Sequence, residues 1–423
     1  MRGLLGRVAV DVSALRESRD YRVLVGGQLL SGLGTAAVLV ALPYQLFVLT
    51  GSPALVGLLG AAELGPMVIV SLLGGAIADR MDRRTLLLIA QVGIIATAMG
   101  LAAATWAGRP PTLLIFVLGG LLAGGSSLDL VTRSAIIPGL AGPNLRAAVS
   151  FNFGLYQLTG IVGPAIGGVL IASVGVGATY AVDAGSCLAM ALAVLAIPPQ
   201  HPPAIVGERP RVASSIAEGL RFVRANRALM GSFAIDLVAM TFGMPRALFA
   251  VLSLTVYHAG AEGAGAMYAA VSAGAAVAAL TTGWLTHARR LGRIVIVAVV
   301  VWGLAIAGAG AVGSLLPALV LLAAAGAADS VSAVCRSTIN QTVTPEHMRG
   351  RMSSVFSLVV TSGPRLGDIE SGTVASLSSA RVSVLSGGLA CVAGVGLIML
   401  AFPALAAYDS HAGAPGEPLP ATA

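Results

Sequence analysis

Charged side chains inside long apolar runs are the residues of this sequence best suited to chemistry. A charge is costly inside a membrane and usually faces a partner or a cavity. Arg365 and Asp368 are three positions apart, so on a helix they share one face and can pair. Glu370 projects from a different side. Such a pair can attract an anion and exchange a proton, or it can be a purely structural ion pair between two helices.

Two further features favour a ligand site around this pair. Gly363 and Pro364 directly precede it and are expected to loosen the helix at that depth. Arg246, in a separate apolar run, is expected to lie opposite. The candidate residues for binding and coupling are Arg246, Arg365, Asp368, Glu370, Glu63 and Asp236.

A second group of charges is expected near the inner ends of its helices. Asp129 and Asp329 lie there, where a salt bridge with Arg133 or a neighbouring arginine fits a gate better than it fits contact with a ligand. The predicted inner gate comprises Asp129, Arg133, Asp329 and Arg336.

Other intramembrane polar residues receive no assigned role. Asp183, like Glu63, lies in the outer half of its apolar run. Gln28, Ser31 and Thr35 share one stripe, which could line a cavity or form hydrogen bonds between helices.

The elements that must position these residues are membrane-spanning helices. The chain has 423 residues, of which 57% are hydrophobic and 10% charged, and its mean hydropathy is +0.90, so it is too apolar for a soluble domain. Twelve apolar runs are each long enough to cross a bilayer. The predicted helices are 23–49, 54–78, 85–105, 112–131, 148–173, 177–198, 228–256, 264–286, 294–314, 317–335, 352–376 and 383–404.

This pattern predicts an all-α membrane protein with twelve transmembrane helices in two six-helix, pseudo-symmetric halves. A repeat supports the duplication, because Arg133-Ser134 recurs as Arg336-Ser337 in the second half. The interval 199–227 opens with a stiff proline-rich stretch and continues into an amphipathic segment at 214–224. The predicted domains are a cytoplasmic tail at 1–22, helical bundles at 23–198 and 228–404, a cytoplasmic linker with an amphipathic helix at 199–227, and a disordered cytoplasmic tail at 405–423.

The arginines set the expected orientation. The chain contains no lysine, and 21 of its 25 basic residues fall in the segments predicted to be inside. Arg109 and Arg381 fall in outer loops, and Arg246 and Arg365 within helices. Short loops rich in basic residues stay in the cytoplasm. Both chain termini are therefore expected to be cytoplasmic.

A charged turn at 74–84 joins two of the long apolar runs. Gly75, Asp79, Arg80, Arg83 and Arg84 resemble motif A of the major facilitator superfamily. The resemblance implies a gating loop, in which Asp79 caps or pairs with the inner end of the helix at 352–376 and the arginines lie at the anionic leaflet. Asp82 departs from the pattern, because most of the superfamily has glycine there. The alternative is an ordinary basic cytoplasmic loop.

The fifth apolar run carries a second pattern. Gly163, Pro164, Gly167 and Gly168 resemble motif C, which is typical of exporters in the superfamily. Glycines allow close helix packing and proline bends a helix, so the pattern implies a seal that opens as the halves rock. A simple packing face of small residues is the alternative.

Further residues narrow the resemblance to the enterobactin-exporter branch. They are Asp82, the segments 267–270, 274–276 and 280–283, and the pair Gly367-Asp368. The branch implies proton-driven antiport of a catecholate siderophore out of the bacterial cytoplasm across the inner membrane. The motif B of drug exporters is not visible in 112–131, which leaves the coupling site open. The alternatives are a broad drug or macrolide efflux pump and a non-transporting receptor or enzyme.

Several function classes are disfavoured. Without lysine there is no Walker-type phosphate loop and no Schiff-base chemistry. The three cysteines and five histidines are scattered, so no metal site and no cofactor are expected, and there is no nucleophile–base pair to indicate an enzyme. The net charge of +7 follows from the orientation rule rather than from nucleic-acid binding. The expected partners are a small-molecule substrate, protons and membrane lipids, and the protein is expected to be a monomer.

Overall fold

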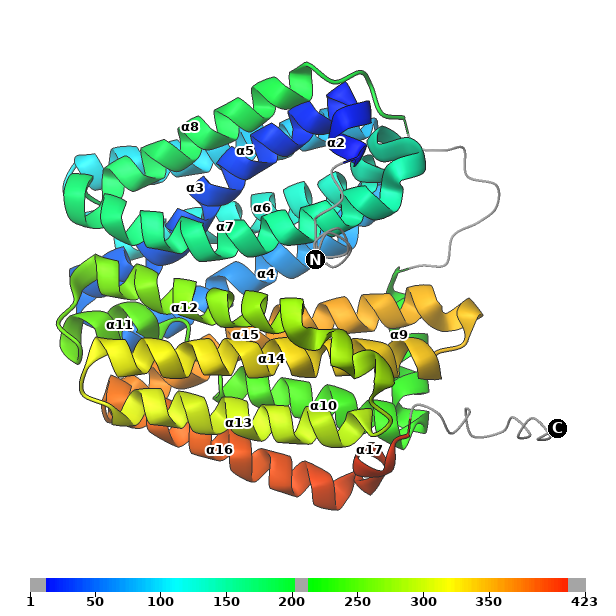
Figure 1. Ribbon diagram of the computed structural model, residues 1–423. Helices are drawn as coiled ribbons and strands as arrows, with labels where there is room; N and C mark the ends of the chain where they lie inside the picture. The colour runs from blue at the N-terminus through cyan, green and yellow to red at the C-terminus, as the bar shows by residue number, and fades with distance from the viewer. Residues whose placement is uncertain (1–12, 202–211, 410–423) are drawn as a thin grey trace, which may run out of the picture. The chain divides into compact units, whose positions relative to one another are not determined.

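Helices account for all the regular secondary structure that the computed structural model describes, in residues 13–201 and 212–409 (Figure 1). Most of the predicted N-terminal tail, the middle of the linker and most of the C-terminal tail lie outside these residues. Nine helices of the described chain are long and apolar enough to cross a membrane, judged by length and composition. The chain is a multi-pass membrane protein.

The described chain divides into two compact units. The first comprises 1–51, 61–206 and 258–269, and the second comprises 52–60, 207–257 and 270–423. Helices α4 and α12 therefore contribute to both. The elements up to the linker are α2 (Ser13–Glu17), α3 (Arg19–Thr50), α4 (Pro53–Ala78), α5 (Arg83–Trp106), α6 (Thr112–Ala141), η1 (Gly142–Asn144), α7 (Leu145–Val174) and α8 (Val176–Leu195).

The remaining elements begin with α9, which forms where the amphipathic linker helix is predicted. They are α9 (Val212–Ala225), α10 (Arg227–Phe242), α11 (Leu248–Thr255), α12 (Gly260–Thr281), η2 (Thr282–His287), α13 (Leu291–Ala311), α14 (Leu315–Val343), η3 (Glu346–Met348), α15 (Arg349–Leu377), α16 (Ala380–Ala401) and α17 (Pro403–Ala407). In the first unit α3 packs on α7 and α8, and α5 packs on α6 and α8. In the second, α13 packs on α14 and α16, and α10 packs on α15 and α16.

The predicted single helix at 228–256 is wrong. The chain forms α10 and α11, separated by 243–247. Pro245 lacks an amide hydrogen and disfavours helical geometry at the residue before it, and Gly243 weakens the helix just ahead of the proline. The break leaves backbone groups near Arg246 without helical partners.

Two predicted helix ends are also wrong. The helix predicted at 112–131 continues to Ala141, and the one predicted at 317–335 continues to Val343. Pro138 lies inside α6 without ending it, and the helix ends only at Ala141, where Gly142 is the C-cap. Arg133 and Arg336 consequently project from helices and not from loops.

The glycines of the motif C pattern lie where helices pack closely in the first unit. A Cβ atom on Gly167 would lie 2.7 Å from the Cα of Ala37 on α3. A Cβ on Gly168 would lie 2.7 Å from the carbonyl oxygen of Ala261, which belongs to α12. Glycine is therefore required at both Gly167 and Gly168, because α7 meets the backbone of α3 on one side and that of α12 on the other. This geometry agrees with a packing role for the pattern.

Gly167→Ala is expected to destabilise the protein by about 1–3 kcal/mol, because the added methyl group meets backbone that cannot move aside. Gly154→Ala on the same helix is the matched control, since nothing lies within 4 Å of its Cβ position. The control should be neutral or slightly stabilising. Thermal unfolding of the two variants in detergent measures the difference, and equal melting temperatures would contradict the packing role.

Candidate functional site

Asp368 of α15 is the centre of a buried charged cluster in the second unit. Its side chain accepts a hydrogen bond from the backbone N–H of Ala247 at 3.0 Å through Oδ1. Its other oxygen, Oδ2, lies 3.4 Å from Nη1 of Arg365, one helical turn away. Arg246 lies within electrostatic range of the same carboxylate. The structure therefore brings together the three residues that the sequence groups here.

The break between α10 and α11 explains one of these contacts. In a continuous helix the N–H of Ala247 would bond to the carbonyl four residues before it. The interruption at Pro245 leaves that N–H free, and the carboxylate of Asp368 accepts it. The same break carries Arg246 to the cluster, so a local helix defect supplies two of the groups around one buried acid.

Glycines hold the surrounding backbone close to Asp368. A Cβ on Gly60 of α4 would lie 2.9 Å from the Cβ of Asp368 and 3.2 Å from its Oδ2. A Cβ on Gly57, one turn earlier, would lie 2.9 Å from the Cα of Gly372. On the opposite side, Gly367 packs on the backbone of Met240 and Thr241. Asp368 is 4% exposed as a result.

The other predicted binding residues are Glu370, Glu63 and Asp236. Glu370 is partly buried, and its Oε2 atom has no hydrogen-bond partner. Glu63 is buried in α4. Asp236 of α10 pairs with Arg336 of α14, and the same arginine lies 3.6 Å from Asp329. Asp236 thus belongs with residues predicted for the inner gate.

The first unit contains the other predicted gate pair. Asp129 and Arg133 form an ion pair one turn apart on α6. Gln91 of α5 donates a hydrogen bond of 2.7 Å from Nε2 to Oδ1 of Asp129. Both carboxylate oxygens of this acid therefore have partners. The glutamine has no charge and no motif spacing to mark it in the sequence, so its part in this site was missed.

The arginines of the motif A loop bind backbone carbonyls of the first unit. Arg84 donates to the carbonyls of Val194 and Leu195 at the end of α8, at 3.1 and 2.7 Å. Arg83 donates to the carbonyl of Ala135 on α6 at 2.8 Å. Cations are favourable at helix C-termini, where carbonyls lack partners. Arg83 and Arg84 thus join the start of α5 to α6 and to the end of α8, while Arg80 is exposed.

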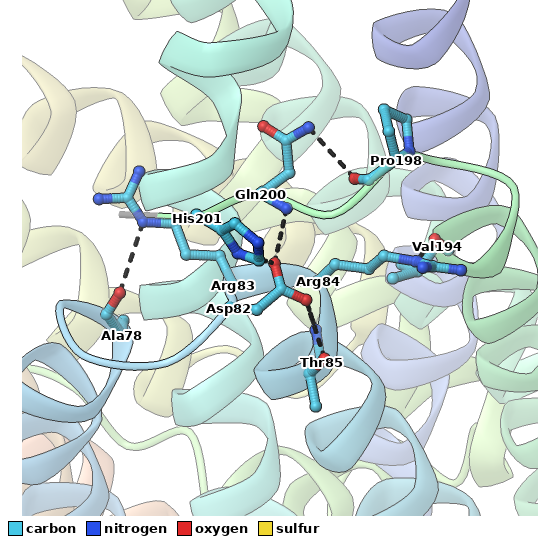
Figure 2. Close-up of polar contacts among 9 residues, drawn as sticks. All are labelled: Ala78, Asp82, Arg83, Arg84, Thr85, Val194, Pro198, Gln200 and His201. Carbon is cyan, nitrogen blue, oxygen red and sulfur yellow. Dashed lines mark hydrogen bonds and ion pairs between the residues drawn. The ribbon is translucent and has the colours of Figure 1, made fainter. Parts of the chain in front are cut away.

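Asp82, the departure from the motif A pattern, joins this loop to the start of the linker. Figure 2 shows its carboxylate between Thr85 and Gln200. Oδ2 caps α5 by accepting from the backbone N–H of Thr85 at 3.1 Å, and Oδ1 accepts from the backbone N–H of Gln200 at 2.6 Å. The N–H of Arg83 in turn donates to the carbonyl of Gln200 at 3.0 Å. Glycine could make neither of the side-chain bonds.

The charge state of Asp82 follows from these contacts. Burial raises the pKa of this carboxyl, but the hydrogen bonds from Thr85, Gln200 and the Arg84 backbone outweigh burial and bring the pKa below its ordinary value of 3.8. His201 adds an exposed ion-pair partner at 3.7 Å. Because the folded pKa is lowered, the stabilisation is complete above the ordinary value and is lost only as the pH falls through the lower folded value. At neutral pH the loop and the linker are fully joined.

A family model described as transmembrane secretion effector matches residues 12–422. The chain belongs to the transmembrane secretion effector family. It is a major facilitator transporter, and its relatives and structural neighbours are membrane transporters, not enzymes.

The relatives of this chain include enterobactin exporters. The chain is 29% identical over 394 residues to the enterobactin exporter EntS of Salmonella typhi, covering 92% of this chain and 94% of the relative. The enterobactin exporter EntS of Shigella boydii serotype 4 is also 29% identical, with 92% and 93% covered. The resemblance to the enterobactin-exporter branch is therefore confirmed.

Solved transporter structures share the fold of this chain. The nucleoside transporter NupG superposes with a TM-score of 0.74 at 14% identity, covering 92% of this chain and 99% of that chain. A bacterial homologue of the iron transporter ferroportin, in an inward-facing state, gives 0.67 at 16% identity, with 92% and 98% covered. At these identities the likeness concerns the fold alone.

Asp82→Ala is expected to loosen the linker, because the α5 cap and the bond to Gln200 are lost together. Loss of an N-cap costs about 1 kcal/mol, which corresponds to roughly fivefold faster hydrogen exchange at the Gln200 amide. Exchange measured by mass spectrometry on peptides that cover 196–201 tests this. Asp82→Asn retains an acceptor and should show a smaller increase.

His201→Ala is the control for Asp82→Ala, since an exposed ion pair contributes little. If His201→Ala loosened the linker as much as Asp82→Ala, the carboxylate bonds would not be what joins the loop to the linker.

Proposed function

We propose that this protein exports an enterobactin-like catecholate siderophore from the bacterial cytoplasm across the inner membrane, in exchange for protons. The observation that carries the proposal is the full-length similarity to enterobactin exporters, which extends over 92% of this chain and 94% of one relative. A transporter that aligns over both halves of its relatives retains the helices that would form a shared substrate path.

The arginines around Asp368 support a substrate of this chemistry. A catecholate carries acidic hydroxyl groups, and Arg presents several donors in a rigid fork that suits adjacent oxygen atoms. In this chain Arg246 and Arg365 both lie around Asp368, so an anionic group that reaches the cluster meets two cations. Glu370, on another side of α15, is proposed to contact the substrate, and Glu63 is proposed to act in the same path.

The transport cycle is proposed to be alternating access between two six-helix halves at 23–198 and 228–404, with twelve membrane crossings. Two observations reconcile that number with the nine long apolar helices. The span counted as Thr112–Val174 contains both α6 and α7. Helices α10 and α11 are each too short to be counted, but together they could cross the membrane once. Helix α15 is long enough but carries several charges, so it is not apolar enough to be counted.

The orientation and the gates form part of the same proposal. Both termini and the linker are placed in the cytoplasm, in accordance with the arginine distribution, and the protein acts as a monomer in contact with membrane lipids. The pairs Asp129–Arg133 and Asp236–Arg336–Asp329 would form inner gates that exchange partners as the halves move. The motif A loop, including Gly75, Asp79 and Arg80, would transmit that movement.

Siderophore secretion in a deletion strain of the source bacterium tests the function. Catecholate in the medium of iron-starved cells is expected to fall in the deletion strain and to recover with the wild-type gene. A protonophore should abolish the recovered secretion in a short assay, before ATP levels fall. Unchanged catecholate secretion, together with iron-independent sensitivity to drugs or macrolides, would favour the broad efflux pump instead.

Arg365→Gln is expected to reduce export at low substrate concentration, because the cluster loses one of the cations that would bind the catecholate. Arg365→Lys keeps the charge but not the forked donors, and should retain intermediate transport. Uptake of enterobactin into inverted vesicles, at matched protein content and over a range of concentrations, separates the three. If the wild type and both variants had equal apparent affinities for enterobactin, Arg365 would not be part of the substrate site.

A further inference from the structure

Asp183 is the one charged residue of α8 and lies where α8 packs closely on α3. Its side chain is 0% exposed. A Cβ on Gly34 of α3 would lie 2.9 Å from its Oδ1 atom, so the glycine lets the two helices meet at this carboxyl. Helix α8 is among the spans that are long and apolar enough to cross a membrane. The acid is therefore deep in an apolar region.

The hydrogen bonds of Asp183 come from uncharged groups. Thr35 of α3 donates from its hydroxyl to Oδ1 at 3.3 Å, and the thiol of Cys187 donates to the same oxygen at 3.6 Å. The other oxygen, Oδ2, is buried and has no hydrogen-bond partner in the described chain. Two weak neutral donors on one oxygen do not compensate a full negative charge.

In the part of the chain that the structure describes, Asp183 forms no ion pair. Arg133 lies within electrostatic range of Cys187, but it is paired with Asp129. Tyr180, one turn from Asp183, donates its hydroxyl to Gln45 at 2.8 Å. The other charged or titratable residues of the helices packed on α8 are Arg19, Asp20, Tyr21, Arg22 and Tyr44 of α3, Arg83 and Arg84 of α5, and Arg146 and Tyr156 of α7.

Helix geometry keeps the charged members of that set away from the carboxyl. Arg22 is thirteen residues before Thr35, which is about 20 Å along α3 at 1.5 Å per residue. Arg83 and Arg84 begin α5, and Arg84 binds the carbonyls at the end of α8, eleven and twelve residues beyond Asp183. An ionised Asp183 would therefore be an unpaired charge.

The other buried acids of the described chain differ from Asp183. Asp129 faces Arg133, Asp236 faces Arg336, and Asp368 faces Arg365 and a backbone N–H. Glu63 has an interaction of its own. An arginine partner stabilises the charged carboxylate and makes proton uptake less favourable. Among the buried acids of the described chain, Asp183 alone combines full burial, neutral donors and an oxygen without a hydrogen-bond partner.

We propose that Asp183, on α8, is the carboxyl that binds and releases the transported proton, with Thr35 and Cys187 holding its Oδ1 and with Oδ2 as the protonated atom. This inference rests on the proposed proton-coupled export. An O–H bond forms at Oδ2 when a proton arrives from water, and the side chain becomes neutral. The same bond breaks when the site opens to water on the other side, the proton returns to water, and the carboxylate is left charged and solvated.

Proton binding at Asp183 is then separate from the arginine cluster at Asp368, although the sequence alone suggests proton exchange at Asp368. It also gives Thr35 a function. Thr35, Ser31 and Gln28 share a stripe on α3, and Ser31 is buried while the Oε1 atom of Gln28 has no partner. These groups extend the polar surface from Asp183 along α3 and provide hydrogen-bonding atoms for water when the helices separate.

Infrared difference spectroscopy of the full-length protein in lipid vesicles tests the protonation directly and needs no substrate. The wild type is expected to show the C=O stretch of a protonated carboxyl, shifted in D2O, which disappears as the pH is raised. Asp183→Asn should lack this titrating band, whereas Glu370→Gln should retain it. A titrating band that is unchanged in Asp183→Asn would overturn the assignment.

Transport assays with enterobactin test the coupling. In proteoliposomes with a pH gradient, Asp183→Asn is expected to lose gradient-driven accumulation while keeping exchange of labelled for unlabelled enterobactin without a gradient. Asp183→Glu should restore gradient-driven transport in part, which rules out a folding defect as the cause. Asp183→Asn preserves the size of the side chain and its hydrogen bonds. If Asp183 were only structural, transport by this variant would still be fully driven by the pH gradient, and that result would contradict the proposal.

The two assays distinguish the possible failures. If the wild type does not transport enterobactin but the Asp183 band titrates, the proposed substrate is wrong and the proton site stands. If the wild type exports enterobactin against a gradient and Asp183→Asn does the same, the export function stands and the proton site is wrong.

Discussion

The cost of an unpaired charge in apolar surroundings is the constraint on which this structure depends. Removing a carboxylate or a guanidinium from water costs several kcal/mol unless a partner and hydrogen bonds compensate it. The chain compensates this cost with ion pairs. Arg133 pairs with Asp129, and Arg336 pairs with both Asp236 and Asp329. These pairs join residues of one helix or of neighbouring helices, so the positions of the charges restrict how the helices can pack.

Breaks and ends of helices supply hydrogen-bond donors to the acids of this chain. A carboxylate with an arginine still has oxygen atoms that need donors, and regular helices offer none because their N–H groups are already bonded. At Asp368 the donor comes from the break after α10, where Pro245 interrupts the ladder and exposes the N–H of Ala247. At Asp82 it comes from the first turn of α5, at Thr85, and from the backbone N–H of Gln200. Each of these acids is therefore tied to a point where a helix ends.

The sequence predicts the parts of the fold that depend on composition and periodicity. Most helix positions, the pairing of Arg365 with Asp368 and the proximity of Arg246 follow from apolar runs, helical spacing and the cost of charge. What could not be predicted depends on tertiary contacts. Nothing in the local pattern at 132–141 indicates that α6 continues, and nothing at Gln200 indicates that its backbone meets Asp82. Asp183 was visible as an intramembrane acid, but only the structure shows that its neighbours are a hydroxyl and a thiol and not an arginine.

The contrast between Asp183 and Asp368 has a consequence for energy coupling. Asp368 is surrounded by cations that suit an anionic substrate, and Asp183 by neutral groups that suit a neutral carboxyl. The two acids lie on different helices, α8 and α15, and accept hydrogen bonds from different donors: Thr35 and Cys187 at Asp183, and Ala247 and Arg365 at Asp368. A proton on one cannot then displace a substrate from the other by direct competition. If both sites act as proposed, coupling requires that each ligand favour one conformation of the whole chain, so that the proton and the substrate influence each other only through that shared equilibrium.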